Sequence, residues 1–176
     1  LIQTESADTN RLPQLPQVQK AFGTVPNMFR AVANSPAALA MMWSAFGALG
    51  KGQLGAGLGE QIAVAVANRN GCDYCLAAHT VLGQAAGVTA AQLAEAQVGR
   101  SADARTQAAL DFALALVSGR GQVDAGHFQA LRAQGFDDAA IVEILAHVAL
   151  NVFTNYTNIA FDVPVDFPVV ALRQAA

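Results

Sequence analysis

The chain has 176 residues and a formal net charge of −3, with 53% hydrophobic and only 13% charged residues. This length suits one domain, and the ten Lys and Arg residues form no basic patch of the kind that nucleic-acid binding requires. Soluble domains usually carry about 25% charged residues, so part of this surface is expected to be covered by oligomerisation. No window of about 20 residues is apolar without polar interruption, which argues against a membrane protein.

Two cysteines occur, Cys72 and Cys75, and the loop between them is too short to stabilise a domain if they were joined. A local redox or metal-binding role in a reducing compartment fits such a pair better than a structural disulfide does. The first thirty residues contain no apolar run and therefore show no signal peptide. The expected location is the cytoplasm.

Helix signals follow one another along the chain. Residues 1–25 are expected to form an N-terminal arm with one short helical turn. Ser35 before Pro36 is a typical helix start, the pair Asn70–Gly71 is a typical helix end, and Thr89 begins a capping box and a short helix. The other helices are expected over residues 27–33, 37–47, 58–70, 72–86, 103–118, 124–133 and 138–155.

The segment from Ile62 to Ala67 alternates in a way that a strand would also show. A helix is the preferred interpretation, because every second residue is alanine and the chain offers no second strand for pairing. The predicted fold class is therefore all-α, in a single domain. We expect this domain to span residues 26–168 and to be followed by an extended C-terminal tail, residues 169–176.

Cys72, Cys75 and His79 form the pattern with the most chemical content. Positions i, i+3 and i+7 fall within one narrow stripe of a helix, so two thiols and an imidazole face the same way. Both cysteines lie near the start of the predicted helix, where the helix dipole and the free N–H groups favour a thiolate. A second thiol one turn away can attack the oxidised first thiol and form a disulfide.

Two residues are candidates for proton transfer. His79 titrates near neutral pH. Glu60 is the only acidic residue on the preceding predicted helix, which is apolar from Ile62 to Ala67. A carboxylate at the head of a largely buried helix suits a proton relay.

The spacing of Glu60, Cys72, Cys75 and His79, together with the residues between them, resembles the core motif of the AhpD-like alkylhydroperoxidases. This family is a branch of the carboxymuconolactone decarboxylase superfamily, and the likeness extends over about residues 26–168. It implies an all-α, AhpD-like helical bundle that assembles into homo-oligomers, typically trimers or hexamers. It implies no metal, haem or flavin cofactor.

The resemblance also implies a role for each residue of the motif. Cys75 corresponds to the peroxidatic thiol and Cys72 to the resolving thiol, while His79 and Glu60 relay protons to and from Cys75. The implied substrate is a hydroperoxide, and an external dithiol or reductase protein restores both thiols. The decarboxylases of the superfamily lack the cysteine pair, so lactone decarboxylation is not expected.

The order of the two thiols has two interpretations. The helix dipole favours Cys72 as the acidic thiol, whereas the resemblance and the nearness of His79 favour Cys75, which is the order adopted here. The chain also departs from the best-studied type of the family, because Tyr74 stands where that type has a histidine. An ordinary phenol, with a pKa of about 10, cannot replace an imidazole as a base at pH 7.

Two other functions compete with a peroxidase. A thiol–disulfide oxidoreductase with little peroxidase activity would use the same cysteine pair. A non-enzymatic metal-binding or redox-sensing domain would use Cys72, Cys75, His79 and Glu60 as ligands, although a lone C-x-x-C is only half of a usual zinc site.

For the remaining histidines and a group of asparagines, a structural role is the preferred interpretation. His127 is interpreted as a solvated surface residue, and His147 as a helix-face partner of Glu143, with a role in the site or in an interface as the alternative. A polar row on the last helix is interpreted as a source of hydrogen bonds between helices or subunits, with substrate binding as the alternative. This row consists of Asn151, Asn155 and Asn158.

Overall fold

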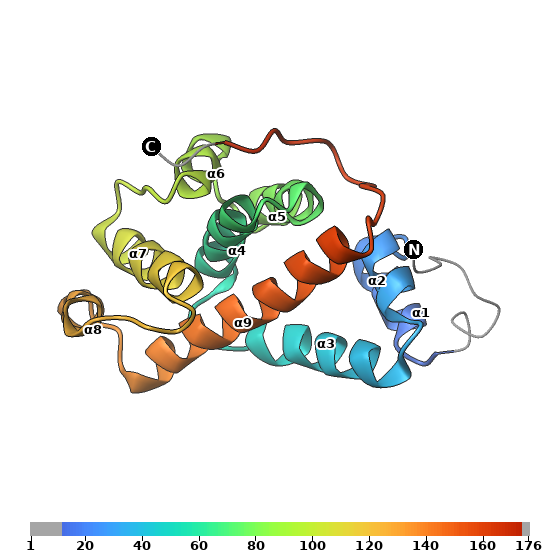
Figure 1. Cartoon of the computed structure of the whole chain (residues 1–176), viewed down its shortest axis with the longest axis horizontal. Helices are drawn as coiled ribbons and strands as arrows, with labels where there is room; N and C mark the ends of the chain where they lie inside the picture. Colours follow the sequence, from blue (N-terminus) through green and yellow to red (C-terminus); the bar gives the residue numbers. More distant parts are fainter. Residues whose placement is uncertain (1–11, 174–176) are drawn as a thin grey trace.

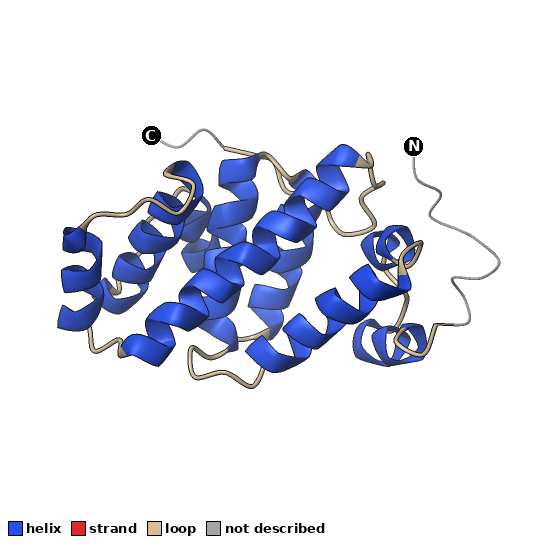
Figure 2. Cartoon of the chain, turned by 60° about the horizontal axis from the view of Figure 1, so that its bottom comes forward, coloured by secondary structure: helices blue, strands red, loops and turns tan. Residues whose placement is uncertain are grey.

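The computed structural model of the chain describes residues 12–173, and helices are the only regular structure in that range. Figure 1 shows their arrangement, and Figure 2 shows from a second direction that no strand accompanies them. The all-α prediction is confirmed. The helices are α1 (Leu15–Phe22), α2 (Asn27–Val32), α3 (Pro36–Leu49), α4 (Ala56–Asn70), α5 (Asp73–Ala85), α6 (Ala90–Gln97), α7 (Ala104–Ser118), α8 (Ala125–Ala133) and α9 (Asp138–Ala160).

Several helix ends are formed by the residues that the sequence indicated. The hydroxyl of Ser35 accepts a hydrogen bond of 3.2 Å from the backbone N–H of Ala38 at the start of α3. Thr89 and Gln92 form the expected reciprocal capping box before α6. Gly71 ends α4 in the left-handed conformation, with φ 72°, which a residue with a side chain adopts only under strain.

The N-terminal segment contains more structure than the single turn expected there. Helix α1 has eight residues, and its Leu15 and Val18 are buried in an apolar cluster shared with α2 and α3. Phe22 at the end of α1 packs against Phe29 of α2, with ring centroids 5.5 Å apart. These three residues of α1 lie at i, i+3 and i+7, so the helix has an apolar stripe that the core stabilises.

Helices α3 and α9 are also longer than expected. Helix α3 ends at Leu49 rather than at Gly47, and α9 ends at Ala160 rather than at Asn155. The extra turn of α9 is held by the core, since Asn158 within it is buried. Tertiary packing therefore extends α9 beyond the point where its apolar periodicity is clear in the sequence.

Helix α4 lies at the centre of the molecule. It is buried continuously from Gln61 to Asn68 and contacts α5, α6, α7 and α9, which surround it in Figure 1. Its alternating pattern therefore reflects a helix that is enclosed on all sides, so that both the branched residues and the alanines face neighbours. Because α4 also leads directly into α5, the pair fixes the relative position of Glu60 and the two cysteines.

The segment after α9 is extended and lies against the domain. Figure 1 shows it returning from the end of α9 across α5 to α6. Two buried amides hold it: Asn68 exchanges two hydrogen bonds of 2.9 Å with the backbone of Arg173, and Gln97 donates to the carbonyl of Ala171 at 2.8 Å. Its Phe167 packs edge-on against Tyr74, with ring centroids 5.7 Å apart.

Helix α9 is the one helix within residues 12–173 that is long and apolar enough to cross a membrane, by length and composition alone. Its buried residues pack against α4 and α7, as expected of a core helix, and the polar side chains of Asn151, Thr154 and Asn158 are buried among them.

Candidate active site

The candidate site begins at the connection between α4 and α5. The left-handed Gly71 turns the chain directly into Cys72, which is the N-cap of α5. The sulfur of Cys72 accepts a hydrogen bond of 3.4 Å from the backbone N–H of Cys75. Both cysteines are free and buried, and both occupy the helix start, where the expectation from the sequence placed them.

The two thiols differ in their access to an apolar cavity. Cys75 lines a cavity of about 300 Å³, together with Tyr74, His79 and Glu60, whereas Cys72 is completely buried outside it. Five aromatic rings from α1, α2, α3 and the C-terminal segment also line this cavity. They belong to Phe22, Phe29, Trp43, Phe46 and Phe167.

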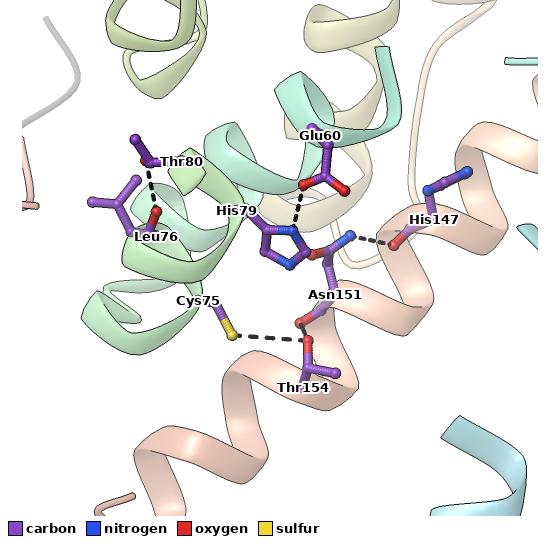
Figure 3. A network of polar contacts seen from close by, with 8 residues as sticks. All are labelled: Glu60, Cys75, Leu76, His79, Thr80, His147, Asn151 and Thr154. Atoms are coloured by element: carbon purple, nitrogen blue, oxygen red, sulfur yellow. Dashed lines mark hydrogen bonds and ion pairs between the residues drawn. The ribbon is translucent and has the colours of Figure 1, made fainter. Parts of the chain in front are cut away.

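His79 and Glu60 form a close pair beside Cys75. The Nδ1 atom of His79 lies 2.8 Å from Oε2 of Glu60, and the imidazole is 11% exposed. Figure 3 shows His79 and Cys75 extending from α5 toward α9, with Glu60 reaching the ring from α4. Burial opposes protonation of the ring, but the charge of Glu60 and the hydrogen bond to it raise the pKa of His79 above its ordinary value.

Helix α9 supplies polar partners for the sulfur of Cys75. The amide of Asn158 donates a hydrogen bond of 3.1 Å to this sulfur, and Oγ1 of Thr154 lies 3.9 Å from it. Asn155 is held in place by Asn70, whose Nδ2 donates to Oδ1 of Asn155 at 2.9 Å. All three residues of α9 are buried, so the contacts of Asn158 and Thr154 with the sulfur are made away from bulk water.

The two thiols differ in pKa because their electrostatic surroundings differ. The hydrogen bond from the side chain of Cys72 lowers the pKa of Cys75 to about 6, with further contributions from the charge of His79 and from the amides of Asn155 and Asn158, against the effect of burial. The pKa of Cys72 is raised above its ordinary value, chiefly by the same hydrogen bond and by burial. Cys75 is therefore the thiol that ionises first, in spite of the position of Cys72 nearer the end of the helix dipole.

Tyr74, which stands where the best-studied type of the family that the chain resembles has a histidine, makes contacts that support the fold. Its hydroxyl accepts a hydrogen bond of 3.1 Å from the backbone N–H of Met28 at the start of α2. Burial raises the pKa of Tyr74 above its ordinary value, so the phenol stays protonated. Tyr74 therefore connects α5 to α2 and to the C-terminal segment, and it carries no proton-accepting function at pH 7.

The structure thus brings together the four residues that the sequence singled out, namely Glu60, Cys72, Cys75 and His79. In the part of the chain that the structure describes, no group of three or more His, Cys, Asp or Glu side chains is arranged to hold a metal ion. His127 is remote from the site on α8, where it pairs with the exposed Asp124 at 3.0 Å.

Sequence reasoning did not assign the partners of Cys75 on α9. The row of asparagines was visible, and two of its members, Asn155 and Asn158, lie at the site. The interpretation as hydrogen bonds between helices holds for Asn155, which pairs with Asn70 of α4. Nothing in the sequence singled out Thr154, because a threonine within an apolar helix often only bonds to the backbone of its own helix.

Residues 36–119 of the chain match the carboxymuconolactone decarboxylase family. A peroxidase-related protein from Ralstonia eutropha JMP134, described as an alkylhydroperoxidase AhpD core, is 26% identical, with a TM-score of 0.75 over 93% of this chain and 86% of that one. A peroxidase-related protein from Silicibacter sp. TM1040 is 24% identical, with a TM-score of 0.78 over 97% and 90%. None of the curated proteins matches the chain significantly.

A third similar structure is that of the debrominase Bmp8 in complex with 2,3,4-tribromopyrrole. It is 22% identical, with a TM-score of 0.79 over 92% of this chain and 89% of that one. The helical arrangement described above is therefore shared by proteins with different named activities, so the function has to be argued from the site.

Proposed function

We propose that the chain is an AhpD-like, thiol-dependent reductase of organic hydroperoxides, and its match to the carboxymuconolactone decarboxylase family and its two peroxidase-related structural neighbours support this proposal. One observation carries this proposal. The more acidic thiol, Cys75, faces an apolar cavity and lies beside a histidine that a carboxylate helps to protonate. A thiolate and an adjacent proton donor are the two groups that cleavage of an O–O bond requires.

In the proposed first step, the thiolate of Cys75 attacks the terminal oxygen of the hydroperoxide. An S–O bond forms while the O–O bond breaks, and the departing alkoxide takes a proton from His79 and leaves as an alcohol. The products are a sulfenic acid on Cys75 and a neutral His79. Glu60 stabilises the protonated imidazole before the reaction and orients the ring through its hydrogen bond of 2.8 Å.

In the second step, Cys72 attacks the sulfenic sulfur of Cys75. The S–S bond forms, the S–O bond breaks, and the hydroxide leaves with the proton of Cys72 as water. An external dithiol, free or carried by a reductase protein, then supplies two electrons. Because its attacking thiol reacts as a thiolate, it brings one proton, and the second proton that restores the starting state comes from solvent. The burial of Cys72 outside the cavity suits a resolving thiol, which meets the sulfenic acid rather than the substrate.

The cavity supports an apolar substrate. Its volume of about 300 Å³ lies at the lower end of the range for small-molecule sites, and its wall is mostly apolar, with six aromatic rings in it. We therefore expect a bulky alkyl or aromatic hydroperoxide to bind more tightly than hydrogen peroxide, which gains little from apolar contacts.

A homo-oligomer in the cytoplasm completes the proposal. Helix α9 carries exposed apolar residues that follow one another at spacings of three, four, seven and three, and such a stripe suits packing against a second copy. The exposed members of this stripe are Val142, Leu145, Ala149, Tyr156 and Ile159. A reducing compartment would keep both cysteines available as thiols.

The test is a stopped-flow reaction of the prereduced protein with cumene hydroperoxide and hydrogen peroxide, in wild type, Cys75→Ser and Cys72→Ser. We expect the wild type to consume cumene hydroperoxide at least about 100-fold faster than free cysteine does. Cys75→Ser should lose the reaction, and Cys72→Ser should accumulate a sulfenic acid that dimedone traps. Loss of the reaction in Cys72→Ser, with sulfenic acid trapped in Cys75→Ser, would reverse the order of the thiols.

The same assay separates the alternatives. A wild type that is no faster than free cysteine, but that exchanges with protein or small-molecule disulfides, is a thiol–disulfide oxidoreductase. Stoichiometric zinc in the purified protein would favour the metal-binding alternative. 2,3,4-Tribromopyrrole is a useful third substrate because of the similar debrominase structure, and its consumption without that of hydroperoxides would replace the proposal.

A further inference from the structure

A second cavity reaches the same proton-relay pair from another direction. Its volume is about 120 Å³, and Glu60 and His79 line it as they line the apolar cavity. Within the described residues, Cys75 lines the first cavity and not the second. The Glu60–His79 pair thus stands between the space that a substrate would fill and a separate space, which we call the rear cavity.

The rear cavity has two polar residues of α9 in its wall, His147 and Asn151. The ring of His147 fits there because position 59 is a glycine. A β-carbon at Gly59 would lie only 3.0 Å from Cε1 of His147, closer than such atoms normally approach. The absence of a side chain at this position therefore lets the imidazole lie over α4, one residue from Glu60.

Asn151, which lines the rear cavity, carries an unpaired acceptor. Its Nδ2 donates to the carbonyl of His147 at 2.8 Å, which fixes the amide, as Figure 3 shows. Its Oδ1 has no hydrogen-bond partner among the described residues, and Asn151 as a whole is only 5% exposed, so this oxygen is both buried and unpaired. A buried acceptor without a partner costs about 1–3 kcal/mol, and in proteins ordered water usually satisfies it.

We propose that the rear cavity holds water that exchanges protons between the Glu60–His79 pair and solvent, and that His147 and Asn151 position this water. The volume has room for about four molecules at roughly 30 Å³ each. The wall offers the polar partners that such molecules need, namely a carboxylate, two imidazoles and the unpaired amide oxygen.

The charged and titratable groups that act on His147 agree with this role. Burial lowers the pKa of His147, opposed by Glu143 of its own helix and by Glu60 of α4, while His79 of α5 acts in the same direction as burial. At neutral pH the imidazole is therefore uncharged, with one nitrogen that donates and one that accepts. Such a ring can accept a proton on one nitrogen and release a proton from the other, so it transfers protons without staying charged.

A proton route separate from the substrate cavity has a place in the proposed cycle, on which this role rests. The proton that His79 gives to the alkoxide leaves with the alcohol, and another must reach His79 before the next turnover. The aromatic wall of the first cavity offers few partners for water, and a bound substrate would fill that space. The rear cavity reaches His79 and Glu60 without passing Cys75.

The test compares His147→Phe and Asn151→Leu, which remove polar groups from the rear cavity, with His127→Gln as a control on the remote α8. Wild type and each variant are prepared with isotope-labelled histidine, and NMR measures the exchange of the His79 ring N–H with water in each of them. We expect this exchange to slow at least about fivefold in both cavity variants and to stay unchanged in His127→Gln. Exchange within about twofold of wild type in both cavity variants would overturn the proposal.

Kinetics with cumene hydroperoxide then test the role in turnover. We expect the first turnover of prereduced His147→Phe to stay within about twofold of wild type, while steady-state turnover with excess dithiol falls about tenfold. Equal losses in both phases would indicate a structural defect and contradict the proposal. If wild type reduces no hydroperoxide but ring exchange still slows in both variants, the proposed function fails and the rear cavity retains its role.

Discussion

The amide of Asn158 donates a hydrogen bond of 3.1 Å to the sulfur of Cys75, across 83 positions of sequence. This bond joins the end of α9 to the first turn of α5 in a buried place. A hydrogen bond to a charged group contributes more than one between neutral groups, so Asn158 stabilises the thiolate form of Cys75 over the thiol.

Substitution of Asn158 by Leu should therefore raise the pKa of Cys75 from about 6 by about one unit, because one donor to the buried thiolate is lost. The pH dependence of Cys75 alkylation by iodoacetamide measures this shift. Tyr156→Phe is the control, since Tyr156 lies two residues away on the same helix and is exposed. An alkylation midpoint in Asn158→Leu that equals the wild-type midpoint would show that this hydrogen bond does not stabilise the thiolate.

The local part of the site could be predicted from the sequence, because it depends on helix geometry alone. To place Cys72, Cys75 and His79 on one face, it was enough to predict a helix that starts at or just after residue 72, and Gly71 marks that start. Glu60 could be added because α4 and α5 are consecutive and joined by a short turn. The resemblance then gave each of these residues a role, which remains a proposal.

The partners on α9 could not be predicted in the same way. Their arrival at Cys75 depends on the angle and register at which α9 crosses α5, and these are set by packing of the whole domain. The same limit applies to α1, whose stripe of Leu15, Val18 and Phe22 is short and needs the core to stabilise it. Tyr74 is a third case, since only the structure shows that its hydroxyl meets the backbone of Met28.

The rate of peroxide reduction by wild type should depend on pH as a bell-shaped curve. As pH falls below the Cys75 pKa of about 6, the thiolate is protonated, so the rate declines by about tenfold per unit. As pH rises above the pKa of His79, which Glu60 raises against the effect of burial, the proton donor is lost and the rate declines again. Stopped-flow rates between pH 4.5 and about 9.5 measure both limbs. A rate that keeps rising through the alkaline limb would exclude His79 as the donor.

Glu60→Gln should move the alkaline limb of this curve to lower pH. The amide keeps a hydrogen-bonding group near Nδ1 of His79 but removes the negative charge, so burial is no longer opposed and the pKa of His79 falls. We expect a loss of about tenfold at pH 7, measured in the same stopped-flow series.

The matched control for Glu60→Gln is Glu95→Gln, the same chemical change at an exposed position of α6. Its pH curve should superimpose on that of wild type. If Glu60→Gln lowers the rate equally at every pH, Glu60 contributes to the structure of the site and not to the protonation of His79.

Phe22→Ala should change which peroxide the protein prefers. Phe22 lies in the wall of the apolar cavity at the end of α1, and truncation of its ring removes apolar contact with a bulky substrate. A loss of about 1 kcal/mol corresponds to about a fivefold rise in KM for cumene hydroperoxide, with kcat unchanged because the ring contacts the substrate alike in the ground and transition states. Hydrogen peroxide is too small to use this contact, so its kcat/KM should stay within about twofold of wild type.

Phe128→Ala, the same truncation at a partly exposed site on α8, is the control. An equal loss with both peroxides would mean that Phe22 supports the fold around Cys75 and not the recognition of the substrate.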